Sequence, residues 1–169
     1  MEKLFVLAGK ARSGKDTVAN LIDNNSLEKV LVYSCTTYLK NYIKDIYGDY
    51  DEGNKPRDIL QKFGSEIKEK YPDFFIDRMG EDIRFLSNYY DIIVVTGVRL
   101  VKELEFLKDS FNAVLIKMES DKENGLTEKQ KNDITEIDVD NYNSYDYVIK
   151  NADYEVLKQE VKKIMEDEL

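Results

Sequence analysis

The sequence contains no histidine among its 169 residues. Without an imidazole, the chain cannot form a Ser-His-Asp triad, a Cys-His nucleophile pair or a zinc site that needs histidine ligands. Any proton transfer must therefore use carboxylates, lysines, tyrosines or water.

Cysteine and proline are also scarce. Cys35 is the single cysteine, so no intramolecular disulfide can form, and a reducing cytosol suits the chain. We interpret Cys35 as a small packing residue near the end of a strand. Only two prolines occur, and neither a low-complexity run nor an internal repeat is present, which indicates a folded chain. Its length fits one domain, residues 1–169, with a sizeable core.

Long basic stretches and long apolar runs are missing as well. The net charge is −9, whereas a duplex-binding protein needs a basic surface to replace counterions on phosphate, so we expect no nucleic-acid partner. The apolar run from Leu4 to Ala8 is too short for a signal peptide or a membrane span. We therefore expect a cytoplasmic protein without a membrane partner. A small phosphorylated ligand is compatible with the charge, because a pocket needs only a few local cations.

Apolar runs typical of buried strands alternate with segments of helical period. Strands are expected at residues 4–8, 29–34, 91–96, 113–116 and 145–149. Helical patterns begin near residues 15, 56 and 73, and others include residues 39–47, 104–107 and 157–165. In the helix after residue 56, the buried stripe is expected to comprise Ile59 or Leu60, Phe63 and Ile67. Strands separated by helices predict parallel pairing, so the fold class is α/β, a three-layer sandwich with a parallel five-stranded sheet.

The segment that follows the first strand carries the most specific motif. Gly9-Lys10-Ala11-Arg12-Ser13-Gly14-Lys15 has the Gly-x4-Gly-Lys spacing of a phosphate-binding loop. Its glycines let backbone N–H groups turn toward phosphate oxygens, and the helix that follows adds its positive dipole end. Lys15 can reach the β- and γ-phosphates of ATP. The sequence therefore predicts a P-loop that binds ATP.

The residues after Lys15 depart from the usual motif. Asp16 takes the place of the Ser or Thr whose hydroxyl meets Mg²⁺, and Thr17 follows. A carboxylate is a good hard ligand for Mg²⁺, directly or through water, so Asp16 and Thr17 are the candidate metal residues. The alternative for Asp16 is a first-turn acid that only stabilises the helix dipole.

Several segments in order resemble the deoxynucleoside monophosphate kinases of phages and bacteria, within the nucleoside monophosphate kinase fold. The resemblance covers most of the chain. It rests on Arg12-Ser13-Gly14-Lys15-Asp16-Thr17, on residues 33–40, on Arg57-Asp58-Ile59-Leu60-Gln61-Lys62-Phe63-Gly64, on residues 94–99 with the downstream Glu103, and on residues 146–151. The family implies an ATP-dependent phosphotransferase with Mg²⁺, acting on small nucleotide substrates as a monomer or homodimer.

Roles for individual residues follow from the motif, from strand ends and from this resemblance. The candidate catalytic residues are Lys15, Arg12, Asp16 and Arg99. ATP is expected to contact Gly9, Ala11, Arg12, Ser13, Gly14, Lys15, Asp16 and Thr17, with Asn151 beside the adenine. The acceptor is expected to bind Arg57, Arg78 and Arg99. Each of these arginines has a plain alternative as a solvated surface charge, and Phe63, Phe74 or Phe75 could either stack on a base or fill the core.

Two departures from the family bear on activity. Gly97 stands where the family usually has an Asp that would orient Mg²⁺ or the substrate. The expected flap, at about residues 119–135, contains Lys122, Lys129 and Lys131 but no arginine. Lysine neutralises charge but lacks the bidentate fork of arginine.

Three functions fit these observations. The first is phosphorylation of a (deoxy)nucleoside 5′-monophosphate, with the acceptor held by a helical insert at about residues 35–90. The second is a kinase for another phosphorylated metabolite, such as dephospho-coenzyme A or phosphomevalonate. The third is a non-catalytic nucleotide-binding module. Gly97 and the arginine-free flap support this third function. The intact Gly14-Lys15 pair and Arg99 argue against a non-catalytic module.

Overall fold

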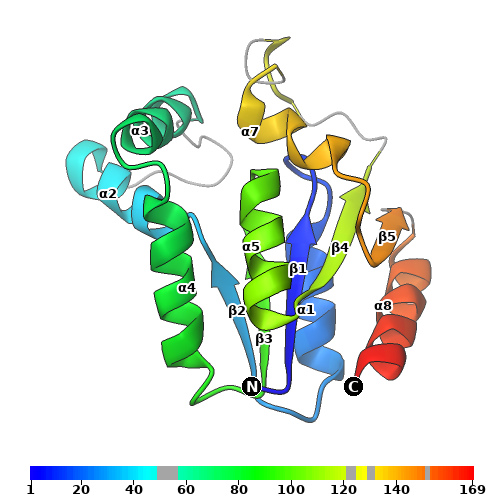
Figure 1. The fold of residues 1–169 in the computed structure, drawn as a ribbon. Helices are drawn as coiled ribbons and strands as arrows, with labels where there is room; N and C mark the ends of the chain where they lie inside the picture. Colours follow the sequence, from blue (N-terminus) through cyan, green and yellow to red (C-terminus); the bar gives the residue numbers. More distant parts are fainter. Residues whose placement is uncertain (49–56, 121–124, 129–131, 151–152) are drawn as a thin grey trace.

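A computed structural model describes residues 1–48, 57–120, 125–128, 132–150 and 153–169. Its centre is one sheet with five parallel strands in the order β2-β3-β1-β4-β5 (Figure 1). The strands are β1 (Lys3–Ala8), β2 (Val30–Ser34), β3 (Ile92–Thr96), β4 (Val114–Glu119) and β5 (Tyr147–Lys150). The predicted fold class is confirmed.

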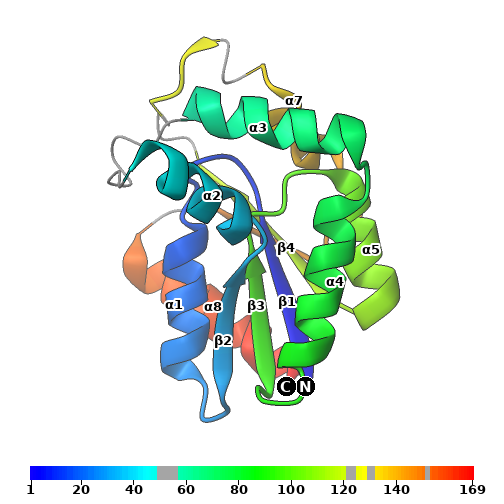
Figure 2. The same cartoon turned by 90° about the vertical axis from the view of Figure 1, so that its left-hand side faces the viewer.

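Two helical layers cover the two faces of the sheet. Helices α1 (Lys15–Asn25) and α8 (Tyr154–Glu168) lie on one face, and α4 (Phe74–Leu86) and α5 (Val101–Phe111) lie on the other (Figure 2). Side chains of a strand alternate between the faces, so Phe5 and Leu7 pack toward α1 and α8, whereas Leu4 and Val6 pack toward α4 and α5. This double burial explains why β1 reads as a continuous apolar run.

The remaining helices lie beyond the carboxyl ends of the strands. Helix α2 (Thr37–Tyr47) and helix α3 (Arg57–Lys70) follow β2, and the short α7 (Ile134–Ile137) and the 3-10 turn η2 (Val139–Asn141) precede β5. In Figure 1, α3 and α7 stand above the upper edge of the sheet, while both chain termini lie at its lower edge. The upper edge is therefore where loops and helices from distant parts of the sequence meet.

The apolar stripe of helix α3 is less buried than its sequence pattern predicts. Its apolar residues Ile59, Leu60, Phe63 and Ile67 are half-buried, and among the side chains of α3 that the structure describes none is fully buried. The helix does not pack on the sheet: Phe63 makes an edge-to-face contact with Tyr42 of α2, and Leu60 lines a pocket. The expected buried stripe is thus only partly covered.

No helix in the described ranges is both long enough and apolar enough to cross a membrane.

The position of the core predicts that two leucine-to-alanine substitutions will differ in their effect on stability. Leu104 on α5 is fully buried against the sheet, whereas Leu27, in the turn before β2, is fully exposed. We expect Leu104→Ala to lower the free energy of unfolding by about 2–5 kcal/mol, through lost burial and the cavity that remains. Leu27→Ala should change it by less than about 0.5 kcal/mol. Urea denaturation measures both, and equal effects would contradict the assignment of the core.

Candidate active site

The predicted phosphate-binding loop connects β1 to α1, and its glycines are required by its geometry. Gly9 has φ 133°, and a Cβ placed there would lie 2.3 Å from the carbonyl oxygen of Met118 on β4. Gly14 has φ 98° and is the N-cap residue of α1. Because Gly14 has no side chain to cap the helix, the first turn of α1 presents its backbone N–H groups toward a ligand.

The Lys15 ammonium folds back over this loop. It donates to the carbonyl oxygens of Gly9 at 2.8 Å and Lys10 at 2.6 Å, and to Ser13 Oγ at 3.2 Å. The Ser13 side chain is buried beneath it. The positive charge is therefore held over the loop, at the end of a helix that favours anions, which fits a phosphate group.

Arg12 joins the loop to the segment that follows β4. It has φ 60°, a conformation that non-glycine residues seldom adopt, and its side chain is exposed. A Cβ placed at Gly125 would lie 2.7 Å from Arg12 Nη1, so the guanidinium packs directly against this glycine. Gly125, in the expected flap, thus contacts the phosphate loop. The flap lysines Lys122, Lys129 and Lys131 lie outside the described residues.

The candidate metal residues Asp16 and Thr17 lie in the first turn of α1, and both are exposed. Within the described ranges, no three or more Asp, Glu, His or Cys side chains gather as a ready metal site. One carboxylate and one hydroxyl fit a Mg²⁺ ion that takes most of its ligands from water and substrate phosphates, which is the usual protein environment of this ion.

Gly97, at the end of β3, has a local reason to be glycine. Its φ is 82°, and a Cβ there would lie 3.2 Å from Thr36 Oγ1 and 3.3 Å from Ser34 Oγ. The two hydroxyls are 3.1 Å apart and share a hydrogen bond. Because they occupy the space beside Gly97, an aspartate at this position would have to adopt a strained backbone and displace them.

A pocket opens beside Gly97, beneath α3. It encloses about 160 Å³ and lies between the ends of β2 and β3 and helices α2, α3, α4, α5 and α7. Its lining residues are Cys35, Thr36, Leu39, Lys40, Leu60, Gln61, Gly64, Ser65, Lys68, Phe75, Gly97, Arg99, Leu100, Glu103 and Ile134. Three of these side chains are cations and one is a carboxylate, in a protein whose net charge is −9. The pocket is therefore a locally positive site that suits an anionic ligand.

Backbone hydrogen bonds to carboxylates fix the position of Arg99. Glu103 Oε2 accepts from the N–H of Arg99 at 2.8 Å and of Leu100 at 3.1 Å, and Asp138 Oδ2 accepts from the N–H of Val101 at 2.7 Å. Three successive N–H groups at the start of α5 are thus satisfied by two acids. Asp138 belongs to the segment after the flap, so this segment helps to hold the pocket wall.

Cys35 is buried at the end of β2 and lines the pocket. Burial, and then the charge of the Glu103 carboxylate, raise the pKa of its thiol well above the usual range. The thiol stays protonated and unreactive, which agrees with the interpretation of Cys35 as a packing residue.

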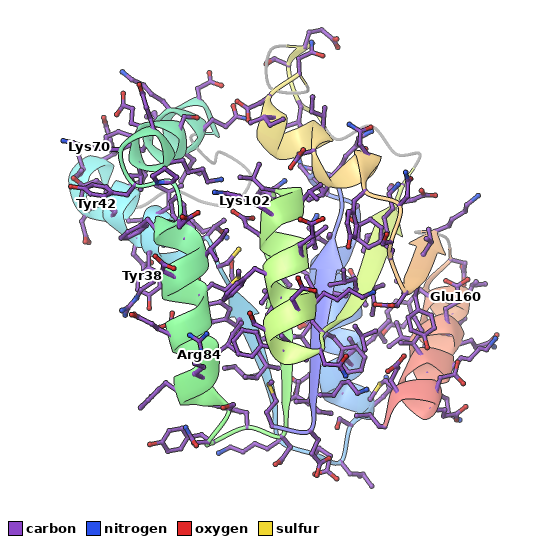
Figure 3. The ribbon with its side chains drawn as sticks, in the orientation of Figure 1. Tyr38, Tyr42, Lys70, Arg84, Lys102 and Glu160 are labelled. Atoms are coloured by element: carbon purple, nitrogen blue, oxygen red, sulfur yellow. The ribbon has the colours of Figure 1, made fainter. Side chains whose placement is uncertain are left out.

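Arg78 lies outside this pocket. Its guanidinium donates to Tyr38 Oη at 3.2 Å and pairs with Glu81 and Asp82, and Tyr38 and Tyr33 both donate to Asp82 Oδ2. Figure 3 shows Tyr38 beside α4, on the outer side of the helical layer. In this structure Arg78 therefore joins α2 to α4 and does not line the pocket.

Two further predicted residues are not placed. Arg57 is the first residue of α3, but its side chain lies outside the described part of the structure, and so does Asn151.

The sequence did not single out Lys68 or Glu103 as residues of the pocket, and it left Phe75 between core and ligand. One signal was present: Gln61, Ser65 and Lys68 recur at helical spacing and form a polar stripe beside the apolar one. This stripe identifies the side of α3 that faces the pocket, but only once the position of the pocket is known.

Comparison with solved structures identifies the architecture. The shikimate kinase of Acinetobacter baumannii matches with a TM-score of 0.54 and 14% identity over 100% of this chain and 96% of that chain. The shikimate kinase of Aquifex aeolicus matches with a TM-score of 0.53 and 15% identity over 97% and 96%. A sugar kinase from Janibacter sp. reaches a TM-score of 0.62 at 9% identity over 98% and 95%. No protein-family model and no curated protein matches the sequence.

At these identities the comparisons establish the fold alone. The chain has the P-loop kinase-like fold, with a parallel sheet in the order 2-3-1-4-5, that is shared with shikimate kinases and nucleoside monophosphate kinases.

The phosphate loop predicts different outcomes for two glycines with positive φ. Gly9→Ala would place its Cβ 2.3 Å from the Met118 carbonyl, whereas a Cβ at Gly48 would meet no atom of the described residues within 4 Å. Both substitutions carry backbone strain of about 1–3 kcal/mol, but only Gly9→Ala must also displace β4 or the loop. We expect Gly9→Ala to abolish ATP binding in calorimetric titration and Gly48→Ala to preserve it. Equal ATP affinity in the two variants would contradict this account of the loop.

Proposed function

We propose that this protein transfers a phosphoryl group from ATP to a (deoxy)nucleoside 5′-monophosphate. The observation that carries the proposal is a cationic pocket next to a phosphate-binding loop. Arg99, Lys68 and Lys40 line the pocket in a protein whose net charge is −9, and Glu103 is the one carboxylate among the described residues that line it. An acceptor that already bears a phosphate supplies the negative charge that these side chains match.

The phosphate loop has what the donor side of such a reaction requires. Phosphoryl transfer depends mainly on positioning and on neutralising charge. Lys15 would exchange its bonds to the loop carbonyls for β- and γ-phosphate oxygens, and Arg12 would approach the transferred group from the same loop. Asp16 and Thr17 would hold Mg²⁺, which would supply positive charge to the phosphate groups when it is bound.

On the acceptor side, Arg99 would hold the monophosphate, and the half-buried Phe75 and Gln61 offer an aromatic face and an amide for a base. The flap would exclude water from the transferred group, because its Gly125 already contacts Arg12. The insert at about residues 35–90 supplies most of the pocket wall, which supports its role as the acceptor-binding unit.

The two alternatives differ in the acceptor. A kinase for dephospho-coenzyme A or phosphomevalonate would use the same cations, because those acceptors are also phosphorylated. The similar solved structures are named as shikimate and sugar kinases. The positive charge of the pocket suits an acceptor that carries a phosphate better than one that does not.

An ATP-consumption assay tests the proposal. Wild-type protein is expected to consume ATP with at least one (deoxy)nucleoside monophosphate, and not with dephospho-coenzyme A, phosphomevalonate or shikimate. Lys15→Ala should lower kcat by roughly a hundredfold or more, since it removes a charge aimed at the transferred phosphate. ATP binding without turnover of any acceptor would contradict the kinase assignment. Turnover that survives Lys15→Ala would contradict the assignment of the loop.

A second measurement compares two arginines. Arg99 lines the pocket, whereas Arg78 is engaged with Tyr38 and Asp82 outside it. We expect Arg99→Met to raise the acceptor KM by roughly ten- to a hundredfold, the worth of a charge-assisted hydrogen bond. Arg78→Met should raise it by less than about threefold. The reverse order would mean that the acceptor binds along α4 and not in the pocket.

A further inference from the structure

Lys68 is a pocket cation that the sequence did not single out. It lies in the last turn of α3, and its side chain is 24% exposed, against 74% for Lys62 on the same helix. Its Nζ lies 5.4 Å from the centre of the Phe75 ring. The ammonium is thus turned into the pocket, while Lys62 forms a solvent-exposed pair with Glu66.

The carboxylate that faces Lys68 is already engaged elsewhere. Glu103 is 5% exposed, and its Oε2 accepts from the backbone N–H groups of Arg99 and Leu100. Its Oε1 lies 3.5 Å from Lys68 Nζ, which is longer than the 2.7–2.9 Å typical of a strong charge-assisted hydrogen bond. An ammonium has three donors, so this loose pair leaves Lys68 able to bind a second anion.

The same carboxylate relates Lys68 to Arg99. One Glu103 oxygen faces the Lys68 ammonium of α3, and the other accepts from the backbone of Arg99 at the end of β3. Lys68 and Arg99 thus line the same pocket from separate walls, and Glu103 contacts the first through its ammonium and the second through its backbone N–H. A phosphate dianion is a stronger partner for two such cations than a carboxylate whose charge is shared with two N–H groups.

We propose that Lys68 and Arg99 together bind the phosphate of the acceptor, and that Lys68 does so through donors that its loose pair with Glu103 does not use. The proposal rests on the proposed function, because it requires a phosphorylated acceptor. It assigns α3 a direct role, since the acceptor phosphate would then hold this partly covered helix against the body of the protein.

Direct binding tests Lys68 without any turnover. The four deoxynucleoside 5′-monophosphates and the matching nucleosides are titrated calorimetrically into the full-length wild-type protein, Lys68→Met, Lys68→Arg and Lys62→Met. Lys68→Met is expected to weaken the tightest monophosphate roughly ten- to a hundredfold and to change nucleoside binding by less than twofold. Lys68→Arg, which keeps the charge, should stay within about threefold of wild type, and Lys62→Met should match wild type.

The remaining outcomes separate this proposal from the proposed function. Unchanged monophosphate affinity in Lys68→Met overturns the role of Lys68, even where the wild type phosphorylates that monophosphate. An equal loss of nucleoside and monophosphate binding, with a lower unfolding midpoint, shows a merely structural role and also overturns it. A wild type that binds no monophosphate overturns it as well. If Lys68→Met weakens monophosphate binding although the wild type transfers no phosphate, the two-cation site stands and the kinase function fails.

Discussion

Burial of the central strands on both faces is the constraint on which the site depends. β1 and β3 are covered by α1 and α8 on one side and by α4 and α5 on the other, so almost no polar group is tolerated along their length. Charged residues can enter only where the strands end. Because all five strands are parallel, their carboxyl ends share one edge, and the phosphate loop and the pocket both lie there.

At this edge, backbone geometry and polar contacts determine which residues are possible. Gly9 must be glycine because β4 passes too close for a Cβ, and Gly97 is glycine because the Ser34 and Thr36 hydroxyls fill the space beside it. The glycine at position 97, where the kinases that the sequence resembles usually have an aspartate, is therefore part of a consistent local structure. Asp16 is the acid that the phosphate loop itself supplies, and it would have to carry more of the contact with Mg²⁺.

The contacts around Glu103 connect parts of the chain that lie far apart. Lys68 comes from the insert, Arg99 follows β3, and Asp138 follows the flap, yet all of them meet at the start of α5. Lys10 of the phosphate loop also pairs with Asp140 in the segment after the flap, at 2.8 Å. The phosphate loop and the start of α5 are thus both contacted by one short segment, residues 138–140.

The amino-acid sequence by itself determined the fold class and the phosphate loop. The run Leu4–Ala8, the spacing from Gly9 to Lys15 and the helical period after it are local patterns, and they depend on residues close together in the chain. The pocket lining was decided only by the tertiary structure. The sequence offered both Arg78 and Arg99 as acceptor residues, but Arg78 on α4 contacts Tyr38 and Asp82, while Arg99 after β3 lines the pocket. Lys68 was identified through its contact with Glu103, which is 35 residues away in sequence. Only folding brings the Lys68 ammonium to 3.5 Å from the Glu103 carboxylate.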